Sequence, residues 1–236
     1  MPLNLRYALM EDWPGISEVS RKSGYEDYIN RIGPEYLKSG EVILAEYQSK
    51  VVGFMKIQFT ADNSSWYSGI RVDPDFRRIS VATSLTEMAF AICRARKTQM
   101  VRLMIHDSNI ASIGLAKKLG FEAVSRFAFF DGIPENFKTV EERPAGMKNP
   151  RFLNMGWIFI PYSSKSEDDL RLISFGKKGL GYMIDKNSVQ IVEGDNSIGL
   201  SGEGYSCMEI SGNLPDYLEK FRDKDFDFAS VYEKSL

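Results

Sequence analysis

Two consecutive arginines, Arg77 and Arg78, precede small side chains at the predicted start of a helix. The first turn of a helix carries backbone N–H groups that have no partner within the helix, together with the positive end of the helix dipole. These donors bind anions, and guanidinium groups pair with phosphate oxygens. The small residues allow a ligand to approach the backbone closely; they are Ser80, Ala82, Thr83 and Ser84. Residue types and spacing therefore predict a cradle for a diphosphate.

Local patterns predict the elements on either side of this turn. Residues 66–72 are rich in aromatic and β-branched side chains, which favour a strand. Asp73-Pro74 predicts a turn, because the residue before a proline is kept out of the helical region. Apolar residues then recur at helical spacing and form one face; they are Val81, Leu85, Met88, Ala89 and Ile92. The order strand, basic turn, helix brings the two arginines to the free N–H groups.

The turn also resembles a known motif. Residues 77–82 read Arg-Arg-Ile-Ser-Val-Ala and resemble the Arg/Gln-x-x-Gly-x-Gly/Ala signature of the GCN5-related N-acetyltransferase (GNAT) superfamily, in which this turn binds the pyrophosphate of acetyl-CoA. Val72 and Pro74 match the frame that precedes it, whereas Ser80 replaces the first glycine and adds a Cβ near the phosphate. The resemblance implies these CoA-binding residues: Arg71, Val72, Arg77, Arg78, Ile79, Ser80, Val81, Ala82, Thr83 and Asn109.

A second segment, residues 109–121, resembles the family's Asn-x-x-Ala-x-x-Leu-Tyr-x-x-x-Gly-Phe pattern. We expect a helix with Ser108 or Asn109 as its N-cap and Gly120 just after its end. Ala116 stands where the family has a tyrosine that often protonates the departing CoA thiolate, and alanine has no proton to give. Together the two motifs, in the right order, identify roughly the first 140 residues as GNAT-like.

The reaction implied by this resemblance is direct attack of an amine on the thioester of acetyl-CoA, a cosubstrate, without a metal. In the family a bulge in the strand before the turn supplies a backbone N–H that polarises the carbonyl, here near Arg71 and Val72. Many members use a glutamate on that strand as a base, but residues 66–72 contain no carboxylate. The substitutes left open are Glu46, Asp131, Glu135 and Tyr67, which are also explained as surface charges or, for the tyrosine, as packing.

His106 is the only histidine and ends a predicted strand at residues 101–106. An imidazole has an ordinary pKa of about 6.5, which suits proton transfer near neutral pH, so His106 is the predicted catalytic residue. A thiol with a pKa of about 8.5 can also leave as a thiolate without an acid. In that case His106 caps the strand end, and the site favours an α-amine, which is neutral more often at pH 7 than a lysine side chain.

The remaining patterns predict an α/β (α+β) fold in two parts. Strands are expected at residues 3–9, 41–47, 51–60, 66–72, 101–106 and 122–130, with helical segments beginning near residue 10, at 25–37, and from residues 81 and 109. This order gives the GNAT-type mixed sheet with helices on both faces over residues 1–142. Turn-rich stretches from Asp131 and from Arg143 predict a linker. Residues 147–236 predict a smaller, mainly β domain with one helix at 215–221.

Composition limits the partners. The chain of 236 residues has a formal net charge of −2, which gives no general attraction to nucleic acid or to an anionic membrane. No apolar run approaches the roughly 20 residues of a membrane span, and the N-terminus lacks the regions of a signal peptide. Cys93 and Cys207 have no metal-ligand spacing, and Cys93 is expected to be a buried thiol. These features predict a cytoplasmic protein.

The sequence thus predicts an acetyl-CoA-dependent N-acetyltransferase whose acceptor is a small-molecule amine or a peptide N-terminus. The alternative is a catalytically weak or inactive GNAT-like domain that senses or holds acyl-CoA, which the replacements at Ser80 and Ala116 and the missing glutamate favour. A third reading is an interaction protein in which the C-terminal domain binds a partner. The sequence leaves three possibilities open for that domain: it covers the acceptor site, it mediates a homodimer, or it does neither.

Overall fold

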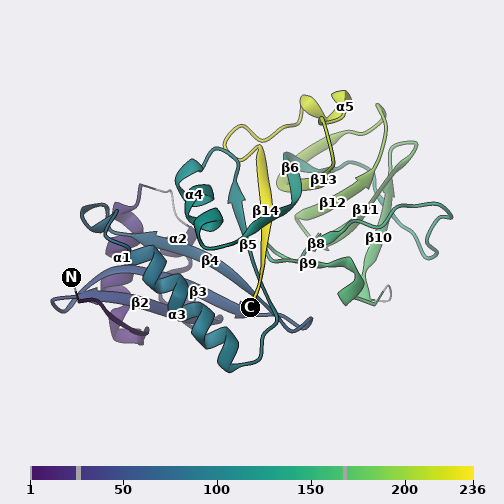
Figure 1. Ribbon diagram of the computed structural model, residues 1–236. Helices are drawn as coiled ribbons and strands as arrows, with labels where there is room; N and C mark the ends of the chain where they lie inside the picture. The colour runs from purple at the N-terminus through teal and green to yellow at the C-terminus, as the bar shows by residue number, and fades with distance from the viewer. Residues whose placement is uncertain (1, 25–27, 167–168) are drawn as a thin grey trace. The chain divides into compact units, whose positions relative to one another are not determined.

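The computed structural model describes residues 2–24, 28–166 and 169–236. The chain forms two compact units, one of residues 1–103 with 234–236 and one of residues 104–233. Each unit is described by itself, with the element labels of Figure 1. No helix in the described ranges is long and apolar enough to cross a membrane.

The first unit is built on a sheet whose strands follow the order β1-β2-β3-β4-β5 (Figure 1). The strands are β1 (Asn4–Tyr7), β2 (Glu41–Tyr47), β3 (Lys50–Phe59), β4 (Ser64–Val72) and β5 (Met100–His106), the last of which ends in the second unit. Neighbouring strands are antiparallel except β4 and β5, which are parallel. Between parallel strands the chain needs a crossover, and the helix after β4 provides it.

Helices cover both faces of this sheet. They are η1 (Met10–Asp12), α1 (Trp13–Lys22), α2 (Tyr28–Ile32), η2 (Gly33–Leu37), η3 (Pro74–Phe76) and α3 (Val81–Ala95). On one face, Phe54 of β3 packs with Ile16 of α1 and Tyr36 of η2. On the other, a Cβ added to the neighbouring Gly53 would lie 2.7 Å from Cγ1 of Val81 in α3. Successive residues of a strand point to opposite faces, so this strand separates the two helical layers.

The second unit begins with the end of β5 and continues through α4 (Ile110–Lys118) into the long strand β6 (Glu122–Pro134). Its sheet follows the order β14-β6-β13-β12-β11-β10-β7, and β8 and β9 form a separate two-stranded sheet (Figure 1). The further elements are β7 (Lys138–Thr139), β8 (Phe152–Asn154), β9 (Phe159–Pro161), η4 (Tyr162–Ser164), β10 (Arg171–Phe175), β11 (Gly179–Asp185), β12 (Ser188–Glu193), β13 (Leu200–Ile210), α5 (Asp216–Glu219) and β14 (Phe228–Ser235). Strands β12 and β13 pair in parallel, whereas β10 with β11 and with β7, β11 with β12, β6 with β13 and with β14, and β8 with β9 are antiparallel.

The mixed α/β fold and the mainly β C-terminal part agree with the sequence patterns, and three details differ. The turn expected at 131–134 is part of β6, because Asp131 and Ile133 pair with β13 around a left-handed Gly132 with φ 82°. The helix expected at 215–221 is reduced to α5. The compact units divide between Leu103 and Met104, because β6 pairs with β14 and β13 and therefore groups α4 and β6 with the C-terminal strands.

Candidate functional site

The connection between β4 and α3 starts with a buried carboxylate. Asp73 is 0 % exposed, accepts a hydrogen bond from the Asp75 N–H (3.1 Å) and forms an ion pair with Lys50 (3.0 Å). Burial by itself would raise the pKa of Asp73, but the hydrogen bonds from Lys50 and Asp75 outweigh it and lower that pKa. The charged carboxylate therefore fixes the turn that leads from the strand to the arginines.

The turn itself contains two residues in the left-handed region. Arg78 has φ 63°, and Ser80 has φ 68° and ψ 14°. Ser80 is the N-cap of α3, but its side chain makes no capping hydrogen bond. The first bond of the helix runs from the Ser84 N–H to the Ser80 carbonyl (2.9 Å). The N–H groups of residues 81–83 precede it and therefore have no partner within the helix, as an anion cradle requires.

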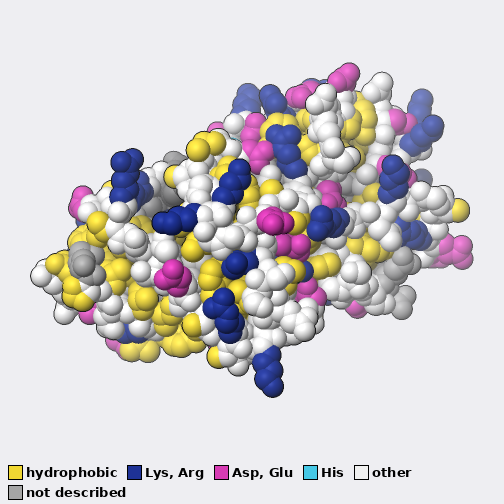
Figure 2. Space-filling view, viewed as in Figure 1, with side chains coloured by type: hydrophobic (Ala, Val, Ile, Leu, Met, Phe, Trp, Pro, Cys, Tyr) yellow, Lys and Arg dark blue, Asp and Glu magenta, His cyan; other side chains and the backbone are white. Residues whose placement is uncertain are grey.

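The arginines of the turn differ in their contacts. Arg77 donates from Nη2 to the Ser23 carbonyl at the end of α1 (3.1 Å), so it ties the turn to that helix. Arg78 is exposed and forms no hydrogen bond or ion pair within the described part of the chain. Figure 2 shows basic side chains spread over one face of the molecule with acidic ones between them. Arg78 is thus a local cation beside the helix start, with its side chain available to a ligand.

A β-bulge lies in β4 before the turn. Phe54 pairs with Arg71 and Lys56 pairs with Ser68, so β4 has one residue more than β3 between these pairs. Gly69, with φ 61°, occupies the bulge and adopts the left-handed conformation typical of glycine there. The sequence analysis expected the bulge near Arg71 and Val72; it lies at 69–70 instead. A glycine inside a strand pattern was the available signal.

The parallel ladder between β4 and β5 is short. Its last pair is Tyr67 with Leu103, whereas β4 runs on to Val72. Diverging strands of this kind leave the edge of β4 open to an extended ligand. The Tyr67 hydroxyl is buried within 3.3 Å of the Cys93 sulfur, and burial raises its pKa. Tyr67 therefore acts in packing, and Cys93 is the buried thiol that its helical position predicted.

In the second unit, His106 has a polar partner on each ring nitrogen. Nδ1 lies 2.6 Å from Oγ of Ser108, and Nε2 lies 3.3 Å from Oδ1 of Asp227. The Phe226 ring packs 4.8 Å from the imidazole, centroid to centroid. The Ser108 backbone N–H also donates to Nδ1 (3.3 Å), so this side of the ring is fixed by Ser108, whereas Nε2 lies beside the carboxylate without a hydrogen bond to it. Asp227 could not be found by sequence reasoning, because it lies far along the chain from His106, just before β14.

The second motif forms the expected helix in the same unit. Asn109 is the N-cap of α4 and accepts a hydrogen bond from the Ser112 N–H (3.1 Å), and Gly120 follows the helix with φ 83°. Ala116 is 3 % exposed and its carbonyl accepts from the Phe121 N–H (3.0 Å). This position faces the protein interior, so Ala116 contributes packing.

The carboxylates considered as substitute bases have other surroundings. Glu46 forms an ion pair with Arg6 (2.9 Å) in the first unit. Asp131 is exposed and pairs with Tyr205 in the second unit's sheet. Glu135 donates its backbone N–H to the Gly199 carbonyl (2.9 Å). None of these contacts links a carboxylate to the β4–α3 turn.

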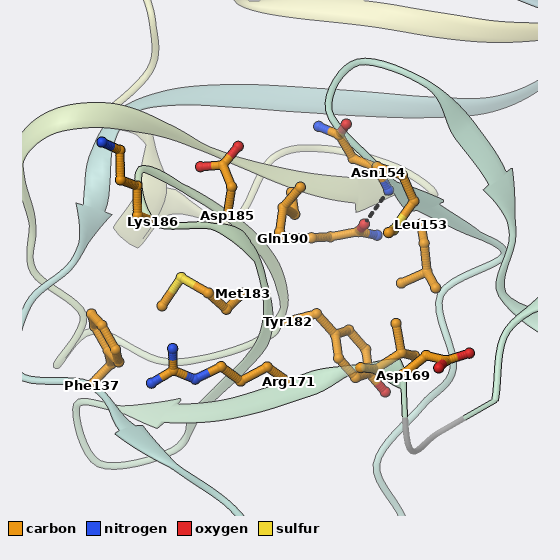
Figure 3. A pocket seen from close by; sticks show the side chains of 13 residues that line it. Phe137, Leu153, Asn154, Asp169, Arg171, Tyr182, Met183, Asp185, Lys186 and Gln190 are labelled. Carbon is orange, nitrogen blue, oxygen red and sulfur yellow. Dashed lines mark hydrogen bonds between the residues drawn. The ribbon is translucent and has the colours of Figure 1, made fainter. Parts of the chain in front are cut away.

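A cavity of about 510 Å³ lies in the second unit (Figure 3). Its two buried side-chain amides are already engaged. Nδ2 of Asn154 donates to the Tyr205 hydroxyl (3.0 Å). Gln190 accepts at Oε1 from the Asn154 backbone N–H (2.8 Å) and donates from Nε2 to the Phe152 carbonyl (2.7 Å). Charged side chains stand around it, among them Asp169 and Arg171. The two hydrogen bonds of the Gln190 side chain, to Asn154 and Phe152, therefore hold β12 against β8.

The comparisons with known proteins agree with this geometry. Residues 4–121 match the model of the acetyltransferase (GNAT) family. A candidate acetyltransferase from Thermoplasma acidophilum superposes with a TM-score of 0.62 at 15 % identity, covering 99 % of this chain and 100 % of that one. Another from Pyrococcus horikoshii gives 0.60 at 15 % identity, covering 99 % and 89 %.

These two structures share the fold over nearly the whole length of the chain, including the mainly β part. Comparison with curated protein sequences gives no match. The family model covers residues 4–121, half of the 236 residues, and includes both motifs of the sequence analysis. The chain belongs to the acetyltransferase (GNAT) family.

Proposed function

We propose that the protein is an acetyl-CoA-dependent N-acetyltransferase that transfers an acetyl group to a primary amine, either a small molecule or a peptide N-terminus. The observation that carries this proposal is the β4–α3 connection. It presents the N–H groups of residues 81–83 at a helix start beside the exposed Arg78. A diphosphate is the ligand that such donors and such a cation suit. Arg71 to Thr83 hold the cosubstrate in this proposal, together with Asn109.

Positioning of two reactants supplies most of the rate in this reaction. The pantetheine arm lies along the open edge of β4, where the parallel ladder has ended at Tyr67. Backbone N–H groups at the bulge around Gly69 donate to the thioester oxygen as negative charge develops on it. The amine nitrogen attacks the carbonyl carbon, the C–N bond forms, the C–S bond breaks and CoA leaves as a thiolate.

His106 is the proposed proton donor to this thiolate. Ser108 contacts Nδ1 at 2.6 Å and orients the imidazole, and the Asp227 carboxylate lies 3.3 Å from Nε2. Its proton goes to the sulfur and is replaced from solvent. Positioned acid–base groups typically contribute about 10²–10⁴-fold to a rate.

A domain that binds acyl-CoA without turnover is the second candidate. The interior position of Ala116, which is 3 % exposed, favours it, because no side chain there can act as an acid. The left-handed Ser80, where the family has glycine, also favours weaker binding of the phosphates.

The test measures release of the CoA thiol from acetyl-CoA with a panel of small amines and of peptides with free α-amines. Thermal unfolding with saturating CoA reports binding separately, and a ligand at about 100 times its Kd adds about 2.7 kcal/mol of stability. An Arg77→Ala, Arg78→Ala double variant should lose this stabilisation. A Lys177→Ala, Lys178→Ala variant is the matched control, because it removes two adjacent exposed lysines from the β10–β11 turn.

Amine-dependent thiol release supports the enzyme. CoA stabilisation without release from any amine supports the second candidate. If CoA stabilises neither the wild type nor the control, or stabilises the arginine variant equally, the proposed site is wrong.

A further inference from the structure

One lysine of the first unit is buried without a carboxylate. Lys56 of β3 is 4 % exposed, and lysines are almost never so buried unless they are paired. Its Nζ donates to Oγ of Ser39 (2.9 Å) and lies 3.6 Å from the centroid of the Tyr36 ring. No acidic side chain of the described residues forms an ion pair with it. Burial lowers the pKa of Lys56 from 10.5 to about 8.

The partners of Lys56 connect it with the bulge in β4. Tyr36 belongs to η2 and is 1 % exposed. A Cβ built on Gly69 would overlap the Tyr36 hydroxyl, so this hydroxyl lies directly against the bulge. Lys56 is also paired in register with Ser68, the residue before the bulge. One continuous cluster is therefore formed by Lys56, the Tyr36 ring and the bulge, and it lies on the face of the sheet that α1, α2 and η2 cover.

Three acidic groups on the elements around this cluster pair with other cations. They pair as Glu18 with Arg21, Glu35 with Lys38, and Glu41 with Arg96. The titratable group that faces Lys56 is the Tyr36 phenol, and Ser39 adds a hydroxyl. Desolvation without a compensating anion is the state in which a lysine amine becomes a usable base near neutral pH.

We propose that Lys56 is the base that accepts the proton of the acceptor's ammonium group, with Tyr36 and Ser39 as positioning residues; this rests on the proposed acetyl transfer. The acceptor's N–H bond breaks, its electron pair stays on the acceptor nitrogen, and Lys56 becomes an ammonium group. The freed pair then attacks the thioester carbon, and the second proton of that nitrogen leaves for water, because His106 protonates the thiolate.

The contacts of Lys56 suit both of its charge states. The face of Tyr36 attracts the ammonium form, which stabilises the protonated product of the step. Ser39 is exposed, so its hydroxyl links the buried amine to solvent and lets the proton leave. Residues 66–72 offer no carboxylate for this step, and Lys56, beside the bulge, takes that role.

The test compares the wild type with Lys56→Met and Lys56→Arg in amine-dependent thiol release between pH 6.5 and 9.5. Methionine keeps the apolar stem, and arginine keeps the charge but stays protonated because its pKa exceeds 12. We expect kcat to fall about 10²-fold or more in both variants, whereas stabilisation by CoA is retained. NMR of ¹³C-labelled lysine side chains should show Lys56 titrating near pH 8, and its resonance is assigned by its absence from the methionine variant.

Two results would overturn the proposal while leaving the acetyl transfer intact: an Arg variant as active as the wild type, which would make Lys56 a structural cation, or a Lys56 pKa near that of free lysine. A wild type that binds CoA but acetylates no amine would instead refute the proposed function, and the role of Lys56 with it. Should both variants fail to fold, Ser39→Ala decides: a shifted pH–rate profile supports the proposal, and an unchanged profile overturns it.

Discussion

Lys56→Met should make the stability of the protein less dependent on pH. Burial lowers the pKa of Lys56 from 10.5 to about 8 in the folded chain. Between these two values the unfolded chain holds the proton and the folded chain does not, so the unfolded state binds more protons and stability rises with pH. Below about pH 8 both states are protonated, and the full cost of burying the ammonium remains.

The structure gives the size of this effect. The two pKa values differ by about 2.5 pH units, and each unit corresponds to about 1.4 kcal/mol. The complete linkage is therefore about 3 kcal/mol, of which about 2 to 3 kcal/mol falls between pH 7 and pH 10. No discount for solvent screening applies, because Lys56 is only 4 % exposed. Methionine has a similar stem and no charge, so the variant lacks this dependence.

Urea unfolding of both proteins at pH 7, 8, 9 and 10 measures the free energy of unfolding. The difference between wild type and Lys56→Met should shift by about 2 to 3 kcal/mol in favour of the wild type across this range. Lys177→Met at an exposed position is the control and should show no such shift. A difference that stays constant from pH 7 to pH 10 would refute the reasoning, because it would mean that the folded state holds the Lys56 proton as tightly as the unfolded state does.

Three further variants test the turn, the bulge and the histidine. Ser80→Gly removes a left-handed serine (φ 68°) and should raise the free energy of unfolding, measured in urea, by up to about 1 kcal/mol. It should also tighten CoA binding measured by calorimetry. Weaker binding would mean that the Ser80 hydroxyl donates to a phosphate. Gly69→Ala should lower the free energy of unfolding by about 2 kcal/mol or more, because φ is 61° and the new Cβ overlaps Tyr36. The control Gly114→Ala, inside α4, should raise it by roughly 0.5–1 kcal/mol. Equal effects of the two variants would contradict the bulge geometry. His106→Ala should lower kcat about 10²-fold, and an unchanged rate would show that the thiolate leaves without an acid.

The strand–turn–helix around Arg77 and the helix after Asn109 could be predicted from the sequence because their signals are local. A proline restricts the backbone angles of the residue before it, and the side chain of the N-cap Asn109 accepts a hydrogen bond from the N–H of Ser112, three residues later. Gly120 adopts the positive φ that is typical just after a helix. Helical spacing also placed Leu85 on the buried face of α3. None of these features needs a contact from a distant part of the chain.

The groups that could move protons depend on tertiary packing instead. Lys56 follows Met55 in an ordinary apolar strand, and only the covering η2 segment makes it a desolvated amine over Tyr36. His106 gains Asp227 from the C-terminal end of the chain. The sequence by itself determined the family and the strand–turn–helix of the proposed cosubstrate site, because local backbone rules and short motifs encode them. The tertiary structure decided which ionisable groups meet and which are desolvated, because pKa values follow from burial and from neighbours far along the chain.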